Sequence, residues 1–258
     1  MRKPLLFSLM LLLAASAFAV PLTASWIEGK VERGSGSAWK LVNIGDKIDS
    51  AESVRLAAGA MAEFAEGNRR ISISAPGTYS LAELVKAGGD QAKKRSTALG
   101  KLGKLVDPKA ADSATAIAGV RGAAQGEAET MWATEGEGPE AIAEEAKSYA
   151  RESRFADAAS LFGQAAELAQ GEEKAGYVYS KAWSLAAGGA TIEAIKVLRA
   201  MSVAGAGPWA GQRALLLARL DIDTGSTAEA RQVLDAAIKA GLAGEDLELA
   251  KAMLAEAK

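Results

Sequence analysis

Most residues whose type and spacing could support chemistry in this sequence are acidic. Asp221, Asp223 and Gly225 alternate as the first positions of a calcium-binding loop do. The glutamate that completes such a loop is missing at the required spacing, so we do not expect a metal site there. Other carboxylates could form a general acid–base pair only if the fold happened to bring two of them together, and no motif indicates that it does. These residues are Asp107, Asp112, Glu127 and Glu129.

The overall composition removes the commonest catalytic groups. The 258 residues include no histidine and no cysteine, which excludes histidine general bases, Ser-His-Asp triads, most zinc sites and disulfides. Gly205-Ala-Gly207 is not followed by the Lys-Ser/Thr pair of a phosphate loop. The formal net charge of −2 gives no support for nucleic-acid binding. We therefore expect no catalytic site and no cofactor.

The strongest cluster of basic residues is Lys93, Lys94 and Arg95. One interpretation is a solvated face of a helix. The other is a weak contact with an anionic envelope surface, such as lipid headgroups or wall polymer. The spacing does not produce a strongly amphipathic membrane-binding face, and both interpretations stay open at this point.

Residues 1–19 have the pattern of a secretory signal peptide. Arg2 and Lys3 precede an apolar run, and Ala17-Phe18-Ala19 forms a small-x-small cleavage site. The run is too short to span a membrane, and no cysteine follows the cut to carry a lipid. We expect a cleaved, exported chain that is periplasmic or extracellular, with no transmembrane span in its mature form.

Residues 20–126 are expected to form one β domain, and from Ser25 to Leu81 the sequence alternates with a period of two. In the run Arg70–Ser74, isoleucines occupy one face and serines the other. Many such short runs, separated by glycine-containing turns, predict a small antiparallel β sandwich or roll. Within this region, leucine spacing over 81–105 predicts a helical insertion of one or two helices, broken near Gly88-Gly89.

An ordered series of motifs in this region resembles the FecR-type periplasmic domain. The motifs are Gly29-Lys30-Val31, Trp39-x-Leu41, Gly45-Asp46-x-Ile48, Val54-Arg55, Ala60-x-Ala62-x-Phe64, Ile71-x-Ile73 and a final strand over 115–122. The resemblance implies a β-rich envelope module used for interaction and, in some relatives, for signalling across membranes. It implies no catalysis.

The last part of the chain, 141–258, repeats with a period of 36 residues. Ala158, Ala194 and Ala230 are 36 residues apart, and each is followed four residues later by a large apolar side chain. A second apolar segment precedes each of them, with glycine or serine in the turn between. This pattern predicts about three stacked helical hairpins. The acidic, glycine-containing segment 127–140 is expected to be a linker.

Within these hairpins the run Ala158/Phe162/Ala165 resembles the tetratricopeptide repeat (TPR) family, with looser copies at the next two periods. The resemblance implies a groove lined by the first helix of each hairpin, which could hold a peptide with an acidic or carboxylate end. Its positions fall on Lys147, Arg151, Tyr179, Trp183, Leu215 and Arg219. The alternative, that Tyr179 and Trp183 are ordinary core residues between repeats, stays open.

Together these patterns predict an α+β protein with two domains. The function expected is that of a non-catalytic, exported scaffold or adaptor that binds a protein partner in the bacterial envelope. A sensory or regulatory envelope protein is the alternative, and a wall-polymer hydrolase is a remote one.

Overall fold

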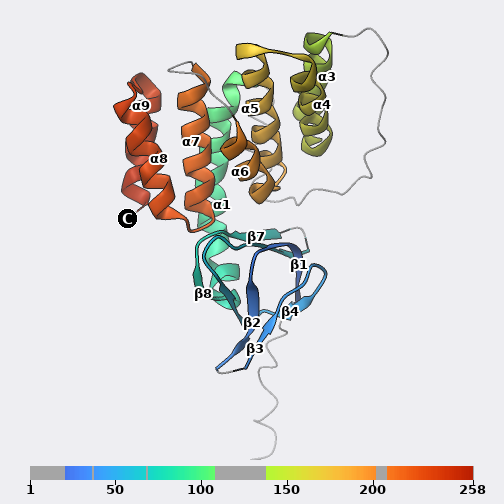
Figure 1. Ribbon diagram of the computed structural model, residues 1–258, viewed down its shortest axis with the longest axis vertical. Coiled ribbons are helices and arrows are strands. Elements are labelled where there is room, and N and C mark those ends of the chain that lie inside the picture. Colours follow the sequence, from blue (N-terminus) through green and yellow to red (C-terminus); the bar gives the residue numbers. More distant parts are fainter. Residues whose placement is uncertain (1–20, 37, 68, 108–137, 202–207, 258) are drawn as a thin grey trace, which may run out of the picture.

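This structure, a computed structural model, describes residues 21–36, 38–67, 69–107, 138–201 and 208–257. The predicted signal peptide, the predicted strand at 115–122 and the Gly205–Gly207 turn lie outside the described residues, as do Asp112, Glu127 and Glu129. The chain has the predicted α+β composition. An antiparallel β region comes first and a region of packed helices follows it (Figure 1).

Two four-stranded sheets form the amino-terminal module. Their orders are β4-β1-β6-β7 and β3-β2-β5-β8, and every neighbouring pair is antiparallel. This confirms the predicted antiparallel sandwich. The strands are β1 (Pro21–Glu28), β2 (Val31–Ser35), β3 (Ala38–Leu41), β4 (Lys47–Asp49), β5 (Ser53–Leu56), β6 (Met61–Glu66), β7 (Arg69–Ile73) and β8 (Gly77–Ser80).

The alternation of the sequence explains the sandwich core. Leu22 and Ala24 on β1, and Val54 and Leu56 on β5, are buried, whereas the residues between them are more exposed. Glu63 on β6 is also buried although it is charged. It accepts hydrogen bonds from Ser25, Ser72 and Arg70, and these replace the water that it loses.

The helical region consists of hairpins that pack in sequence order. The helices are α3 (Pro139–Arg151), α4 (Phe155–Leu168), α5 (Gly171–Ala187), α6 (Thr191–Ala200), α7 (Pro208–Asp223), α8 (Thr227–Lys239) and α9 (Gly244–Glu256). The turns within the hairpins contain Ser153, Gly189 and Gly225, and each has a positive φ. The predicted turn positions are therefore confirmed, because a left-handed backbone favours glycine and small polar residues.

Helix α1 (Leu81–Leu102) and the short 3₁₀ turn η1 (Gly103–Leu105) join the two regions. Their bounds coincide with the predicted insertion 81–105. The predicted break near Gly88-Gly89 is wrong, because the helix is continuous there. Leu81 lies in the sandwich core, whereas Leu99 and Leu102 lie in the core of the helical region, so packing at both ends outweighs the poor helix propensity of two glycines. Figure 1 shows α1 leaving the sandwich and continuing alongside α5 and α7.

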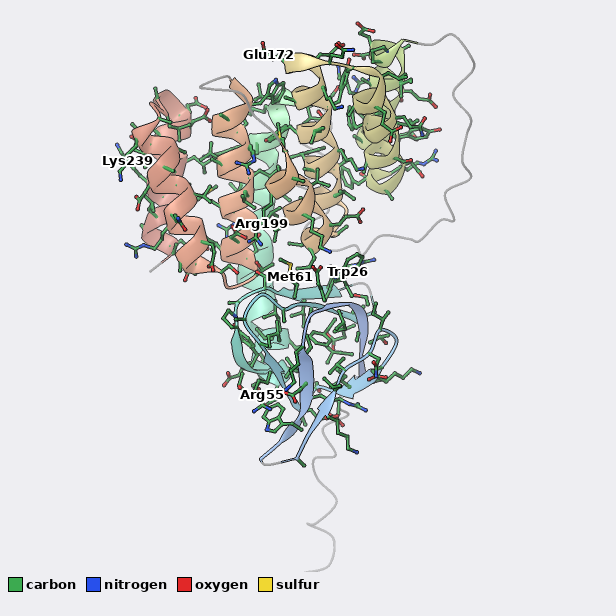
Figure 2. The ribbon with its side chains drawn as sticks, in the orientation of Figure 1. Trp26, Arg55, Met61, Glu172, Arg199 and Lys239 are labelled. Atoms are coloured by element: carbon green, nitrogen blue, oxygen red, sulfur yellow. The ribbon has the colours of Figure 1, made fainter. Side chains whose placement is uncertain are left out.

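The two modules also touch directly. The Ser74 amide donates to the Thr224 carbonyl at 3.0 Å, and the Ser74 hydroxyl lies 2.7 Å from the hydroxyls of Thr224 and Ser226. On α6, Lys196 pairs with Glu28 and lies 4.7 Å from the centre of the Trp26 ring. Figure 2 shows Trp26 and Met61 at the end of the sandwich that faces the helices, with Arg199 above them and Arg55 at the far end. Among the described helices, none is long and apolar enough to cross a membrane.

Candidate partner-binding site

The six predicted groove residues come from the first helix of each hairpin, α3, α5 and α7. In the structure, the carboxyl end of α1, η1 and Asp107 lie against three of them, and we call Arg151, Tyr179 and Trp183 the helix-binding face. The TPR resemblance predicts one groove for all six residues, and the structure brings these three against one segment of the chain. Tyr179 and Trp183 are also fully buried in the core of the helical region, as the alternative interpretation expects. The pattern did not predict what these residues bind, which is a segment of the same chain: the carboxyl end of α1, η1 and Asp107. We call this segment the occupant of the site.

Two aromatic side chains of α5 bind the last turn of α1. The Tyr179 hydroxyl donates to the Leu102 carbonyl at 3.0 Å, and the Trp183 indole N–H donates to the Leu99 carbonyl at 2.9 Å. Both acceptors are main-chain carbonyls at the helix end. The Leu99 carbonyl also accepts from the Gly103 amide, so the Trp183 indole adds a second hydrogen bond to it. Both aromatic side chains are 0% exposed. Burial raises the pKa of Tyr179 above its ordinary value, which keeps the phenol protonated and able to donate.

Gly103 lies directly over the Trp183 ring. A Cβ atom at this position would lie 2.7 Å from the indole Nε1 and closer still to two ring carbons, which no ordinary contact allows. The ring cannot easily move away, because Phe155 packs edge-on against it with ring centroids 5.9 Å apart. The bound segment must therefore carry glycine at this point.

Arg151 on α3 binds Asp107, which follows η1 and Val106 in the chain. Its Nε donates to Asp107 Oδ2 at 3.0 Å, and a second guanidinium nitrogen contacts the same oxygen. The Asp107 side chain is buried, while Arg151 is more exposed. The hydrogen bond to Asp107 raises the pKa of Arg151, consistent with a charge-assisted pair. Asp107, considered above as one member of a carboxylate pair, instead forms an ion pair with Arg151.

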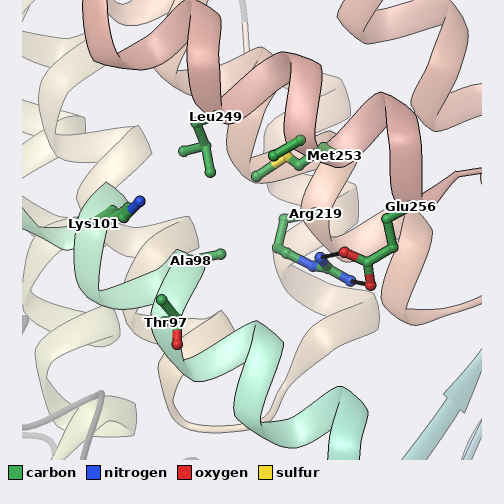
Figure 3. Close-up of a pocket in the computed structure, with 8 residues that line it drawn as sticks. Thr97, Ala98, Lys101, Arg219, Leu249, Met253 and Glu256 are labelled. Carbon is green, nitrogen blue, oxygen red and sulfur yellow. Dashed lines mark hydrogen bonds and ion pairs between the residues drawn. The ribbon is translucent and has the colours of Figure 1, made fainter.

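Arg219 on α7 lies among other residues of the helical core. Its guanidinium donates to Asp223 and, at 2.9 Å, to Glu256 on α9, and its side chain is almost fully buried. Figure 3 shows the pairing of Arg219 with Glu256, which lies beside a surface cavity of about 320 Å³ between α1 and α9. Arg219 is a basic group at the predicted place, but its charge is already paired within the chain.

The other two predicted residues differ in exposure. Leu215 is fully buried in the shared core of the helices. Lys147 pairs with Glu144 at 2.6 Å and lines a second surface cavity of about 340 Å³. The same cavity is lined by Leu105 of η1, and by Tyr177 and Trp209 from the helices opposite. This cavity lies at the solvent-exposed edge of the site that the end of α1 occupies, and we call it the open edge of the site.

The carboxylates of the calcium-like spacing turn toward different arginines. Asp221 accepts from Arg199 at 3.0 Å, whereas Asp223 accepts from Arg219. Burial raises the pKa of Asp221 to about 6, against the opposing effect of Arg199. The described residues contain no group of three or more side chains placed to hold a metal ion.

Gly103, Leu99 and Leu102 are the residues of this site that the sequence did not single out. Their spacing indicated a helix, but nothing local indicated which surface that helix would cover. Comparisons with family models, with curated proteins and with solved structures found no match to this chain. The FecR-type and TPR-type resemblances therefore depend on the sequence motifs alone.

Proposed function

We propose that this protein is a non-catalytic, exported scaffold or adaptor of the bacterial envelope, and that its helical hairpins bind a helix supplied by a protein partner. The observation that carries the proposal is the binding of a helix end by Tyr179 and Trp183. Side-chain donors directed at main-chain carbonyls recognise a backbone, and stacked hairpins commonly present such an extended surface.

The charges at the site support a protein ligand over a small molecule. Arg151 binds a carboxylate next to a helix end, which is an arrangement suited to peptides. The two cavities described above, one beside α1 and one beside η1, are open to the surface and do not form an enclosed chamber. Export is supported by the signal-like sequence of residues 1–19.

A sensory or regulatory role is the second candidate, and one observation favours it. Helix α1 has its first residue in the sandwich core and its last turn in the helical core. Loss of the contact at one end would therefore change how the two modules are held together. The resemblance to FecR-type domains agrees with such a role.

A photo-crosslinking amino acid placed in the full chain, in its native envelope, tests the proposal. Position Leu105 is 54% exposed and borders the occupied site, whereas Leu168, at the end of α4, is 58% exposed and serves as the matched control. We expect a protein to be captured from position 105 and not from position 168. The captured protein is then purified and titrated against the wild-type chain and a Tyr177→Ala variant.

Weaker binding by the Tyr177→Ala chain would place the partner at the open edge of the site, because Tyr177 lines the cavity there. Equal capture from both positions, or a partner whose affinity is the same for both chains, would contradict the proposal.

A further inference from the structure

The contacts around the end of α1 specify what kind of helix this site accepts. Four apolar side chains at the carboxyl end of α1 and just after η1 are buried: Ala98, Leu99, Leu102 and Val106. Lys101 and Lys104, between them, are exposed. The occupant therefore presents one narrow apolar stripe and keeps its charged residues in water.

Two further requirements are more selective than the apolar stripe. The close approach of Trp183 to Gly103 leaves no space for any side chain at that position. Four residues further on, Arg151 requires a carboxylate, supplied here by Asp107. A leucine stripe alone is common in proteins, but a stripe combined with a fixed glycine and a fixed acid is not.

The occupant is held at this end only by non-covalent contacts. Its other end is anchored separately, by Leu81 in the sandwich core and by the partly buried Leu84 and Val85 packed against that core. Gly88 and Gly89 lie between the two anchors, and glycine is among the residues least favourable to helix. The end of α1 can therefore leave the site while its first turns stay in the sandwich.

The geometry points to a site that selects the carboxyl end of a partner's helix by the pattern Leu-x-x-Leu-Gly-x-x-Val-Asp, with α1 occupying the site until that partner displaces it. This inference rests on the function proposed above and adds the chemistry of the partner. The arginine–carboxylate pair and the glycine contact are the features that distinguish this partner from an ordinary amphipathic helix.

A labelled peptide with the sequence of residues 90–107, titrated against the full chain by fluorescence anisotropy, tests the pattern. The Gly103→Ala chain should release its own α1 end, because the added Cβ collides with Trp183. We expect the peptide to bind this chain at least about tenfold more tightly than the wild-type chain, in which the tethered end competes. The same peptide with alanine at its Gly103 position should bind the Gly103→Ala chain roughly tenfold more weakly.

A charge exchange provides an independent measurement if the Gly103→Ala chain loses cooperative unfolding. An Asp107→Arg chain also releases its own end, and it should bind the wild-type peptide better than the wild-type chain does. A peptide with arginine at the Asp107 position should bind the Asp107→Arg chain poorly. An Arg151→Glu chain, in which the new carboxylate repels the chain's own Asp107 and also releases the end, should bind the arginine peptide well and the wild-type peptide poorly.

Equal affinity for the glycine and alanine peptides, together with no response to the charge exchange, would overturn the inference. So would light scattering that shows the Gly103→Ala chain pairing with wild-type copies in the concentration range of peptide binding, since a second copy would then be the occupant. Peptide discrimination without any capture from position 105 would instead leave the recognition pattern in place and remove the proposed function.

Discussion

The two ends of α1 are held in different ways. The amino end inserts the Leu81 side chain into the sandwich core, with Leu84 and Val85 packed beside it, so its side-chain contacts are apolar, while the Leu81 amide donates to the Glu52 carbonyl at 3.3 Å. The carboxyl end adds hydrogen bonds from Tyr179 and Trp183 to its apolar contacts. Apolar burial is non-directional and tolerates many side chains, whereas hydrogen bonds to specific carbonyls require one position of the helix.

This difference indicates separate tasks for the two ends. The amino end is part of the sandwich and should come apart only when the sandwich unfolds. The carboxyl end meets a surface that recognises it residue by residue, through a glycine contact and a charge pair. Variants that weaken the contacts of one end of α1 and not those of the other test this difference directly.

The largest effect is expected at the amino end. Replacing Leu81 by alanine removes a fully buried side chain from the sandwich core and should lower the free energy of unfolding by about 2 to 5 kcal/mol. Urea unfolding followed by circular dichroism measures this. The control is Leu168→Ala at an exposed position, where a change within about 0.5 kcal/mol is expected. Similar losses for both variants would mean that the amino end is not an anchor.

A smaller and more local effect is expected from Gly103→Ala. The added methyl group must displace Trp183 or leave the site, at a cost of roughly 1 to 3 kcal/mol. Hydrogen exchange should become faster over 97–107 and stay unchanged over 81–86. Gly163→Ala on α4 is the matched control, since its Cβ would meet only the flexible end of Lys181, at 3.3 Å. Faster exchange at both ends of α1 would contradict the separation of tasks.

The sequence was sufficient for the elements of this fold because their patterns are local. Alternation with period two requires only neighbouring residues, and the small residue at Ala158, Ala194 and Ala230 marks the second helix of each hairpin. The turn residues Gly189 and Gly225 were likewise visible as glycines between two apolar-periodic segments. Such features do not depend on distant parts of the chain.

The occupant of the site could not be predicted in the same way. The hydrogen bond between Tyr179 and Leu102 joins residues 77 positions apart, and that between Trp183 and Leu99 joins residues 84 apart. No periodicity links such positions. The predicted break at Gly88-Gly89 has the same origin, because the burial of Leu99 and Leu102 that holds the helix together is also non-local.

A further test separates hydrogen bonding from burial at the carboxyl end. Tyr179→Phe removes only the hydroxyl and so takes one buried hydrogen bond from the Leu102 carbonyl, which should cost about 1 kcal/mol in urea unfolding. Tyr177→Phe is the control on the same helix, because its hydroxyl donates to Glu173 at an exposed position and its loss should cost under about 0.5 kcal/mol. Equal costs would show that the Tyr179 hydroxyl adds nothing specific.

The smallest effect is expected where the modules touch without α1. Ser74→Ala removes the hydroxyl that lies 2.7 Å from Thr224 and from Ser226 but keeps the main-chain hydrogen bond to Thr224. The Thr224 hydroxyl keeps its hydrogen bond to the Leu220 carbonyl at 2.9 Å, so the loss should be about 0.5 kcal/mol. Urea unfolding at two wavelengths, one for strands and one for helices, measures it. If Ser74→Ala instead separated the two transitions while Gly103→Ala did not, the direct contact and not α1 would join the modules, and the end of α1 would be exchangeable without moving the sandwich.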